Sequence, residues 1–238
     1  MIFSSKRNLV YIILAGLFIT NAIVAELIGS KLIHIGIFVM SIGIIPWPVV
    51  FLTTDLINEY YGRSGVKKLS LITAGLISYA FVILFFAINV PAAVGISKTE
   101  VTDSQFTSVF GQSMWIIVGS IVAFIFSQLV DVSIFWMLRD KTGGKMIWLR
   151  STGSTIVSQL IDTFIVGGIG FWLPGKVDTA TFINMSITGY TFKLIIAIVL
   201  TPMIYVGHNA IEKYLGDEES HKIIKHSAEE SLHHKVEE

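Results

Sequence analysis

The sequence predicts an all-α membrane protein, a bundle of six transmembrane helices with both termini cytoplasmic. Three observations predict this fold. Hydrophobic residues make up 53% of the 238 residues and charged residues only 14%, against about 25% in an ordinary soluble domain, and the mean hydropathy is +0.72. Apolar stretches of about 20 residues recur, each long enough to cross a hydrocarbon core of roughly 30 Å. Lys and Arg residues gather in alternate connections between these stretches.

Six spans follow one another along the chain, and Trp and Tyr stand at several of their boundaries, where amphipathic rings prefer to lie. The expected spans are Leu9–Ile28, Ile37–Glu59, Leu69–Val90, Met114–Met137, Trp148–Trp172 and Tyr190–Ile211. If the N-terminus is cytoplasmic, most of the 17 Lys and Arg residues fall on the cytoplasmic side. An even number of spans puts both termini on that side, so the span count and the charges agree.

The chain divides by composition into a transmembrane domain, residues 1–215, and a charged cytoplasmic tail, residues 216–238. We expect the tail to be frayed or loosely helical. Its histidines have no fixed partner spacing, so no metal site is predicted there. The connection from Pro91 to Gln112 is the longest external one and is expected to carry a short surface helix.

The second span ends in polar residues that a membrane helix seldom carries. Asp55, Asn58 and Glu59 are spaced i, i+3, i+4, which puts them on one helical face. Upstream, Pro46 and Pro48 predict a kink or a broken helix, because proline removes a backbone donor and obstructs the preceding turn. Discontinuous helices beside polar faces are typical of transporter binding sites.

The fourth and fifth spans share a polar pattern. The two segments read Ser127-Gln128-Leu129-Val130-Asp131 and Ser158-Gln159-Leu160-Ile161-Asp162. In each, the Gln and the Asp are three residues apart and share a helical face. Polar residues can simply hold membrane helices together. Two such pairs together with the polar face of the second span favour a functional cavity instead, because ionisable groups in spans are costly and usually mark function.

The candidate binding residues therefore lie on four spans. They are Asp55, Asn58, Glu59, Gln128, Asp131, Gln159, Asp162 and, in the first span, Asn21. Three further charged residues are candidates for a gate or an ion pair. Lys193 is expected to pair with Glu26 or to extend to the membrane interface, and Arg150 is expected either to take part in such a pair or to anchor its helix at the interface.

Catalytic and nucleotide-binding patterns are missing from the sequence. There is no phosphate-binding Gly-rich loop with Lys-Ser/Thr, no His-Glu-x-x-His run and no Gly-x-Ser-x-Gly segment, and there is no cysteine. We therefore expect no enzyme, no cofactor, no bound metal and no nucleic acid partner. A small-molecule transporter remains, in one of three forms: a self-sufficient carrier, a proton-coupled symporter, or a substrate-binding subunit that needs a separate ATPase module.

The polar segments resemble the queuosine precursor transporter family, also called the vitamin uptake transporter family. The similar stretches are Pro48 through Thr54-Asp55-Leu56-Ile57-Asn58-Glu59-Tyr60-Tyr61-Gly62, Ser127 to Asp131, Trp148 to Thr155, Ser158 to Thr163, Asn21 with Lys31, and Lys193 with Thr201-Pro202. Ser151 departs from the Asn expected in many relatives. The resemblance implies a multi-pass protein of the bacterial inner membrane, and it leaves a homodimer open.

The resemblance also implies a ligand, namely the 7-deazaguanine bases 7-cyano-7-deazaguanine and 7-aminomethyl-7-deazaguanine, imported for queuosine modification of tRNA. A guanine-like edge offers a ring N–H and an amine that one carboxylate can accept together. We expect Asp131, Gln159 and Asp162 to read the edge of the base. Asp55, Asn58 and Glu59 would then line the cytoplasmic exit.

Overall fold

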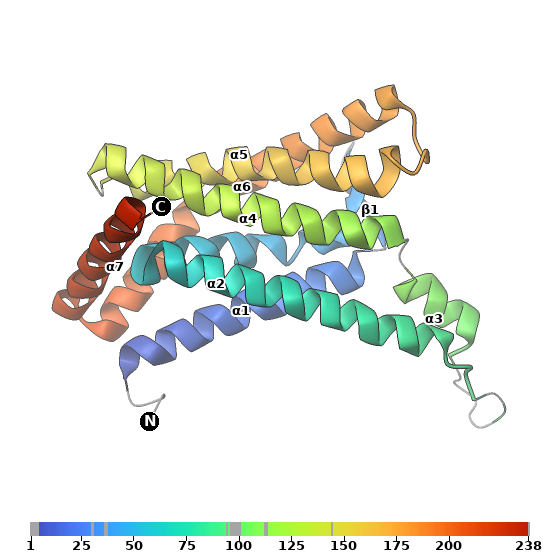
Figure 1. The fold of residues 1–238 in the computed structure, drawn as a ribbon, viewed down its shortest axis with the longest axis horizontal. Coiled ribbons are helices and arrows are strands. Elements are labelled where there is room, and N and C mark those ends of the chain that lie inside the picture. The colour runs from blue at the N-terminus through green and yellow to red at the C-terminus, as the bar shows by residue number, and fades with distance from the viewer. Residues whose placement is uncertain are drawn as a thin grey trace.

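The computed structural model of this chain is almost entirely helical, and it describes residues 5–29, 31–35, 38–93, 95, 101–111, 114–143 and 145–237 (Figure 1). The helices are α1 (Lys6–Ile28), α2 (Trp47–Asn89), α3 (Asp103–Phe110), α4 (Met114–Thr142), α5 (Ile147–Gly167), α6 (Thr179–Leu215) and α7 (Asp217–Glu237). A turn of π-helix, η3 (Gly168–Trp172), extends α5. This arrangement confirms a polytopic helical membrane protein.

Helix α2 consists of two arms that meet at Gly62. This residue has φ 73° and ψ 177°, a conformation open to glycine but strained for other residues. Figure 1 shows the two arms running back along each other from this point. Five segments of the described chain are long and apolar enough to cross a membrane, and α2 supplies one of them. Counted as two arms, α2 brings the number to the six spans expected from the sequence.

The expected start of the second span is wrong. Its first residue, Ile37, lies outside the described residues, and the chain around it forms an antiparallel pair of strands, β1 (Leu32–Ile35) and β2 (Phe38–Ser41), followed by a short 3₁₀ turn, η2 (Ile42–Ile44). A short apolar run does not distinguish a strand from a helix, and β-branched residues are frequent here. The two prolines stand at the helix start, where proline is tolerated, so the helix begins at Trp47.

Two other elements sharpen the predicted boundaries. Helix α6 begins at Thr179 rather than at Tyr190, and the Asp178 side chain caps it by accepting a hydrogen bond from the Thr181 backbone N–H at 3.0 Å. Hydrogen bonds from Thr181 lower the pKa of Asp178, which is fully exposed. The expected surface helix is confirmed as α3, which starts with a reciprocal capping arrangement between Thr102 and Gln105.

The bundle presents an apolar surface outward and gathers its polar side chains inside. Helices α4 and α5 run side by side, α6 packs against α5, and α1 packs against α2 (Figure 1). Large exposed hydrophobic residues cover the outer helix faces; they include Ile13, Leu17, Val82, Phe85, Phe86, Ile198, Val199 and Val206. Such a surface suits lipid tails and would be a liability in water.

The two ends of the chain meet at one end of the bundle. The Lys6 ammonium donates a hydrogen bond to the Tyr214 carbonyl at 3.1 Å, which ties the start of α1 to the end of α6. Helix α7 packs across the same end, with Ser220, Ile223 and Ser227 buried. The tail therefore forms a 21-residue helix, and these buried side chains hold it against the bundle. We call this side of the molecule the α7 end.

Candidate functional site

Buried polar side chains form a continuous strip between the first arm of α2, α4 and α5, and we call this set the polar core. Its members are Asp55, Asn58, Glu59, Ser127, Gln128, Asp131, Arg139, Arg150, Ser151, Ser154, Ser158, Gln159 and Asp162, all of them buried. Seven of the eight residues expected to bind a ligand belong to it. The structure thus brings together residues that are as many as 107 positions apart in the sequence.

Glu59 and Arg150 form the part of the polar core nearest the α7 end. The Arg150 guanidinium donates to Glu59 Oε2 at 2.6 Å, and Arg139 lies 3.9 Å from the same oxygen. Arg150 is only 1% exposed, so it is a buried ion-pair partner, and the interpretation of an interfacial anchor is wrong. Within the first turn of α5, Trp148 is exposed, so Arg150 is buried because its side chain lies on the inner face of the helix, against Glu59.

Helix α7 covers this ion pair. The Ser227 hydroxyl donates to the Glu59 carbonyl at 2.9 Å, and Arg139 donates to the Ile224 carbonyl at 3.2 Å. The Ser220 hydroxyl donates to the Tyr60 hydroxyl at 3.2 Å, and that hydroxyl also lies 2.9 Å from His208 Nδ1. His208 therefore takes part in a half-buried contact with Tyr60. These bonds close the α7 end of the polar core.

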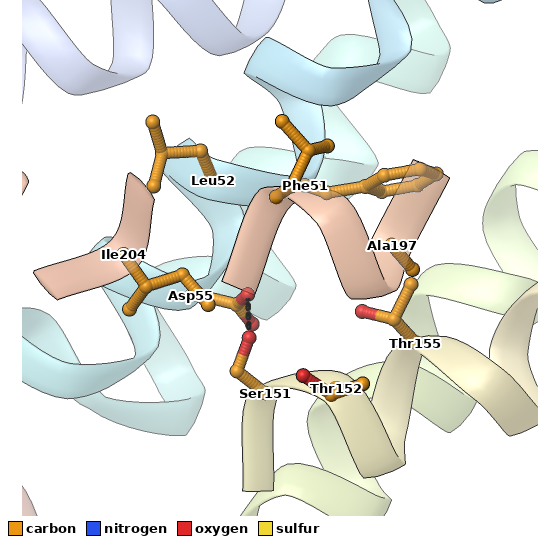
Figure 2. Close-up of a pocket in the computed structure, with 9 residues that line it drawn as sticks. Phe51, Leu52, Asp55, Ser151, Thr152, Thr155, Ala197 and Ile204 are labelled. Carbon is orange, nitrogen blue, oxygen red and sulfur yellow. Dashed lines mark hydrogen bonds between the residues drawn. The ribbon is translucent and has the colours of Figure 1, made fainter. Parts of the chain in front are cut away.

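Asp55 is the next carboxylate along the strip, and Ser151 on α5 donates a short hydrogen bond to its Oδ2 (Figure 2). Its other oxygen, Oδ1, is buried and has no hydrogen-bond partner within the described residues. A small cleft between α2, α5 and α6 opens beside this carboxylate. Its empty volume, including the part open to solvent, is about 270 Å³. It is lined by Phe51, Leu52, Asp55, Ser151, Thr152, Thr155, Ala197, Leu200 and Ile204.

The two Ser-Gln-Leu-x-Asp segments bond to each other reciprocally. The Ser158 hydroxyl donates to Asp131 at 3.1 Å, and the Ser127 hydroxyl lies 3.5 Å from Asp162. Because Ser and Asp are one helical turn apart in each segment and the helices are antiparallel, each serine meets the carboxylate of the other segment. The sequence shows that the two segments share a pattern, but it does not predict this exchange of partners.

Lys193 on α6 completes the strip at the far side from α7. Its ammonium lies 2.5 Å from Asp162 Oδ2, so its ion-pair partner is Asp162, and neither of the two expected arrangements, a pair with Glu26 or extension to the interface, describes it. Glu26 accepts a hydrogen bond from the Ser120 hydroxyl at 2.6 Å and stays within electrostatic range of both Lys193 and Asp162. The three charged residues therefore form one group whose closest pair is Lys193 with Asp162.

Two amide side chains in the polar core have unused hydrogen-bonding atoms. Both polar atoms of the Asn58 side chain and Oε1 of Gln128 have no partner within the described residues, although Asn58 is 0% and Gln128 4% exposed. A buried polar group without a partner costs about 1–3 kcal/mol, so such atoms usually bind water or a ligand. Together with Asp55 Oδ1 they supply both donors and acceptors.

One expected binding residue lies apart from this set. Asn21 is half-buried, and its side chain donates to the Leu17 carbonyl of its own helix at 2.8 Å. Arg139 and the motif serines belong to the polar core as well, although the sequence pattern does not single them out as binding residues. Only the position of Arg139, two residues after the expected end of the fourth span at Met137, indicates that its side chain could reach into the bundle. No group of three metal-ligating side chains occurs within the described part of the chain.

Comparisons with known proteins fit this picture. The family model described as "Putative vitamin uptake transporter" matches residues 41–207. A "Probable queuosine precursor transporter" of Bacillus subtilis is 31% identical over 173 residues, which is 72% of either chain. The "Queuosine precursor transporter" of Escherichia coli K12 is 27% identical over 180 residues, 74% of this chain and 76% of that one.

A second "Probable queuosine precursor transporter", from Haemophilus influenzae, is 26% identical over 162 residues, covering 66% of this chain and 63% of that one. No solved structure matches this chain. The matched region ends at residue 207, so the end of α6 and all of α7 lie beyond the family match.

Proposed function

Since the chain belongs to the vitamin uptake transporter family, we propose that it imports queuosine precursors, the bases 7-cyano-7-deazaguanine and 7-aminomethyl-7-deazaguanine, for queuosine modification of tRNA. It is a multi-pass transporter of the bacterial inner membrane. The curated relatives that carry a queuosine precursor name cover most of both chains in the alignments, which supports this choice of ligand.

The observation that carries the proposal is the set of buried atoms with unused hydrogen-bonding capacity. Asp55 Oδ1, the Asn58 amide and Gln128 Oε1 lie in the bundle interior without partners among the described residues. A guanine-like base offers a ring N–H and an exocyclic amine on one edge, which a carboxylate accepts together, and a carbonyl beside them, which an amide N–H can donate to. The polar core supplies each of these groups.

The remaining polar residues take supporting roles in this proposal. Asp131 and Gln159 extend the binding surface on α4 and α5, and Asp162 joins it when Lys193 moves away from its carboxylate. Because the cleft beside Asp55, at about 270 Å³, is smaller than the roughly 300–1,000 Å³ of ordinary ligand pockets, the base enters as the helices move apart. Movement of helices around a fixed central site is the usual way in which transporters alternate access.

We further propose that the α7 end faces the cytoplasm. The basic residues of the connections gather there; they are Lys6, Arg7, Arg63, Lys67, Lys68, Arg139, Lys141 and Lys145. Positive residues in short connections mark the cytoplasmic side of bacterial membrane proteins. With this orientation, the Glu59–Arg150 pair and α7 close the cytoplasmic exit in the present conformation.

Uptake measurements on purified protein in liposomes test the proposal. The wild-type chain alone should take up both bases, whereas a subunit that depends on a separate ATPase module would need its partner. Asn58→Ala and Gln128→Ala should each lower uptake by about tenfold or more, since each 1.4 kcal/mol of lost recognition is a factor of ten. Lys222→Ala, on the exposed face of α7, is the matched control and should transport normally. Unchanged uptake in both polar-core variants would refute the assignment of the site.

A further inference from the structure

The buried charges of the polar core do not balance. Within the described residues, the buried carboxylates are Asp55, Glu59, Asp131 and Asp162 and the buried guanidinium groups are Arg139 and Arg150. Both arginines lie against Glu59, and Lys193 lies against Asp162. The cations of this region are therefore held by two of the four carboxylates.

Asp55 and Asp131 have hydroxyl partners in place of cations. Ser151 donates to Asp55 and Ser158 donates to Asp131, and neither carboxylate forms a salt bridge within the described residues. The two serines share one face of α5 with Ser154, which lies within range of Asp131. A hydroxyl can orient a carboxylate but cannot neutralise it.

These two carboxylates also act on each other. Among the charged groups around Asp55, Asp131 interacts with it most strongly, followed by Arg150 and then by Glu59 on the same helix as Asp55. Two negative charges that share a buried site repel each other strongly, and each loses its hydration. A positive charge shared between them removes both penalties, and membrane carboxylates of this kind mark ion or proton pathways.

A second observation points to a ligand at this place. Asp55 Oδ1 is itself without a partner among the described residues, as is the amide of Asn58 one turn further along the same face. The residues are 3% and 0% exposed. Asp55 lines the cleft between α2, α5 and α6 (Figure 2), so its carboxylate lies beside the space that the proposed substrate would use.

We propose that the Asp55–Asp131 pair is a cation subsite that takes one positive charge together with each base. This inference rests on the proposed function, because the charge has two sources there. With the neutral cyano base, the charge is a proton that binds a carboxylate oxygen on the outside and leaves it on the inside. With the aminomethyl base, the charge is the ammonium group of the base itself, which binds the deprotonated pair in place of a proton, so that no proton crosses with this base.

The two bases therefore differ in how a pH gradient acts on their uptake. Purified wild-type protein in liposomes is given each labelled base in turn, with the membrane potential clamped at zero by potassium and valinomycin. The cyano base should accumulate when the lumen is more alkaline, up to about tenfold for one pH unit, because a proton crossing one unit releases the free energy of a tenfold concentration ratio. The aminomethyl base should reach equal concentrations on both sides under these conditions. It should accumulate only when a negative-inside potential is imposed.

A single substitution tests whether the pair carries the charge. Asp131→Asn removes one carboxylate at nearly constant volume, and it should abolish the accumulation of the cyano base that the pH gradient drives and lower uptake of the aminomethyl base at least about tenfold. Asp178→Asn is the matched control, since this exposed carboxylate caps α6 and asparagine caps a helix equally well. The comparison of the two bases on wild-type protein needs no variant, so poor folding of Asp131→Asn would not spoil the test.

Three results would overturn the inference. The same response of both bases to the pH gradient would exclude a subsite at which the ammonium takes the place of the proton. Simple equilibration of both bases, with no response to either gradient, would exclude a cation subsite while leaving the proposed function in place. Entry of neither base into liposomes that hold folded protein would refute the proposed function, and the cation subsite with it.

Discussion

The two Ser-Gln-Leu-x-Asp segments of α4 and α5 have nearly the same sequence but different electrostatic surroundings. Each serine bonds to the aspartate of the other segment, at 3.1 Å for Ser158 with Asp131 and 3.5 Å for Ser127 with Asp162. Asp162 also holds the Lys193 ammonium at 2.5 Å. Asp131 has no such cation within the described residues and instead lies near a second carboxylate, Asp55.

This difference shows that a third helix, α6, determines whether each aspartate is neutralised by a cation. Helix α6 supplies Lys193 at the level of Asp162 and only apolar residues beside the cleft, among them Ala197, Leu200 and Ile204. The neutralised carboxylate is suited to holding helices together until something displaces the lysine. The carboxylate without a cation is suited to taking up a positive charge from outside the protein.

Removing the Lys193 ammonium should cause the largest loss in the free energy of unfolding. Lys193→Met leaves Asp162 buried without its cation, and breaking a buried ion pair in this way costs about 3–5 kcal/mol. Because the Lys193 side chain is 20% exposed, we expect the lower end of that range. Unfolding of the detergent-purified protein, followed with a denaturant, measures the loss, and uptake should fall with it.

The double variant Lys193→Met/Asp162→Asn is the control for this experiment. It removes both charges, so it should recover at least half of the stability that the single variant loses. A double variant as unstable as the single one would mean that Lys193 contributes through packing, and that the contrast between the two aspartates is not electrostatic.

Replacing each aspartate in turn should have a smaller effect, and an unequal one. Asp162→Asn leaves Lys193 without its closest partner, but Glu26 remains within electrostatic range of the ammonium, so we expect a loss of about 1–2 kcal/mol. Asp131→Asn removes a charge that has no cation, and its stability should stay within about 0.5 kcal/mol of wild type or rise. Thermal unfolding of both variants in the same detergent gives the comparison, and equal losses would contradict it.

The sequence predicted which residues gather inside the bundle, because the cost of burying charge applies wherever a span carries one. Asp55, Asn58 and Glu59 share a face of α2 as their spacing requires, and all three are buried. The pairing of charges could not be predicted in the same way. Whether Lys193 pairs with Glu26 or Asp162 depends on the rotation of α6 about its axis and on its position along the neighbouring helices. A local sequence pattern predicts neither of these.

The largest errors concern segments whose structure depends on distant parts of the chain. The apolar residues before Trp47 form paired strands, although their hydropathy alone fits a helix equally well. Arg150 stands near a span end, where arginine usually reaches water, but its side chain lies inside the bundle and pairs with Glu59. Helix α7 is as polar as a frayed tail would be, yet Ser220, Ile223 and Ser227 face the bundle and fix it there.

The two motif serines should also differ in what their loss costs. Ser158→Ala removes a 3.1 Å hydrogen bond to Asp131, a carboxylate whose few partners are hydroxyls, so we expect a loss of about 1–2 kcal/mol in the free energy of unfolding. Ser127→Ala should cost about 0.5 kcal/mol or less, because its 3.5 Å contact with Asp162 is at the limit of a hydrogen bond. The Ser127 hydroxyl also reaches the Phe124 carbonyl, and Asp162 keeps Lys193 in any case. Unfolding of the two variants side by side measures this difference, and a greater loss for Ser127→Ala would show that Asp162, despite its lysine, depends more on its serine than Asp131 does.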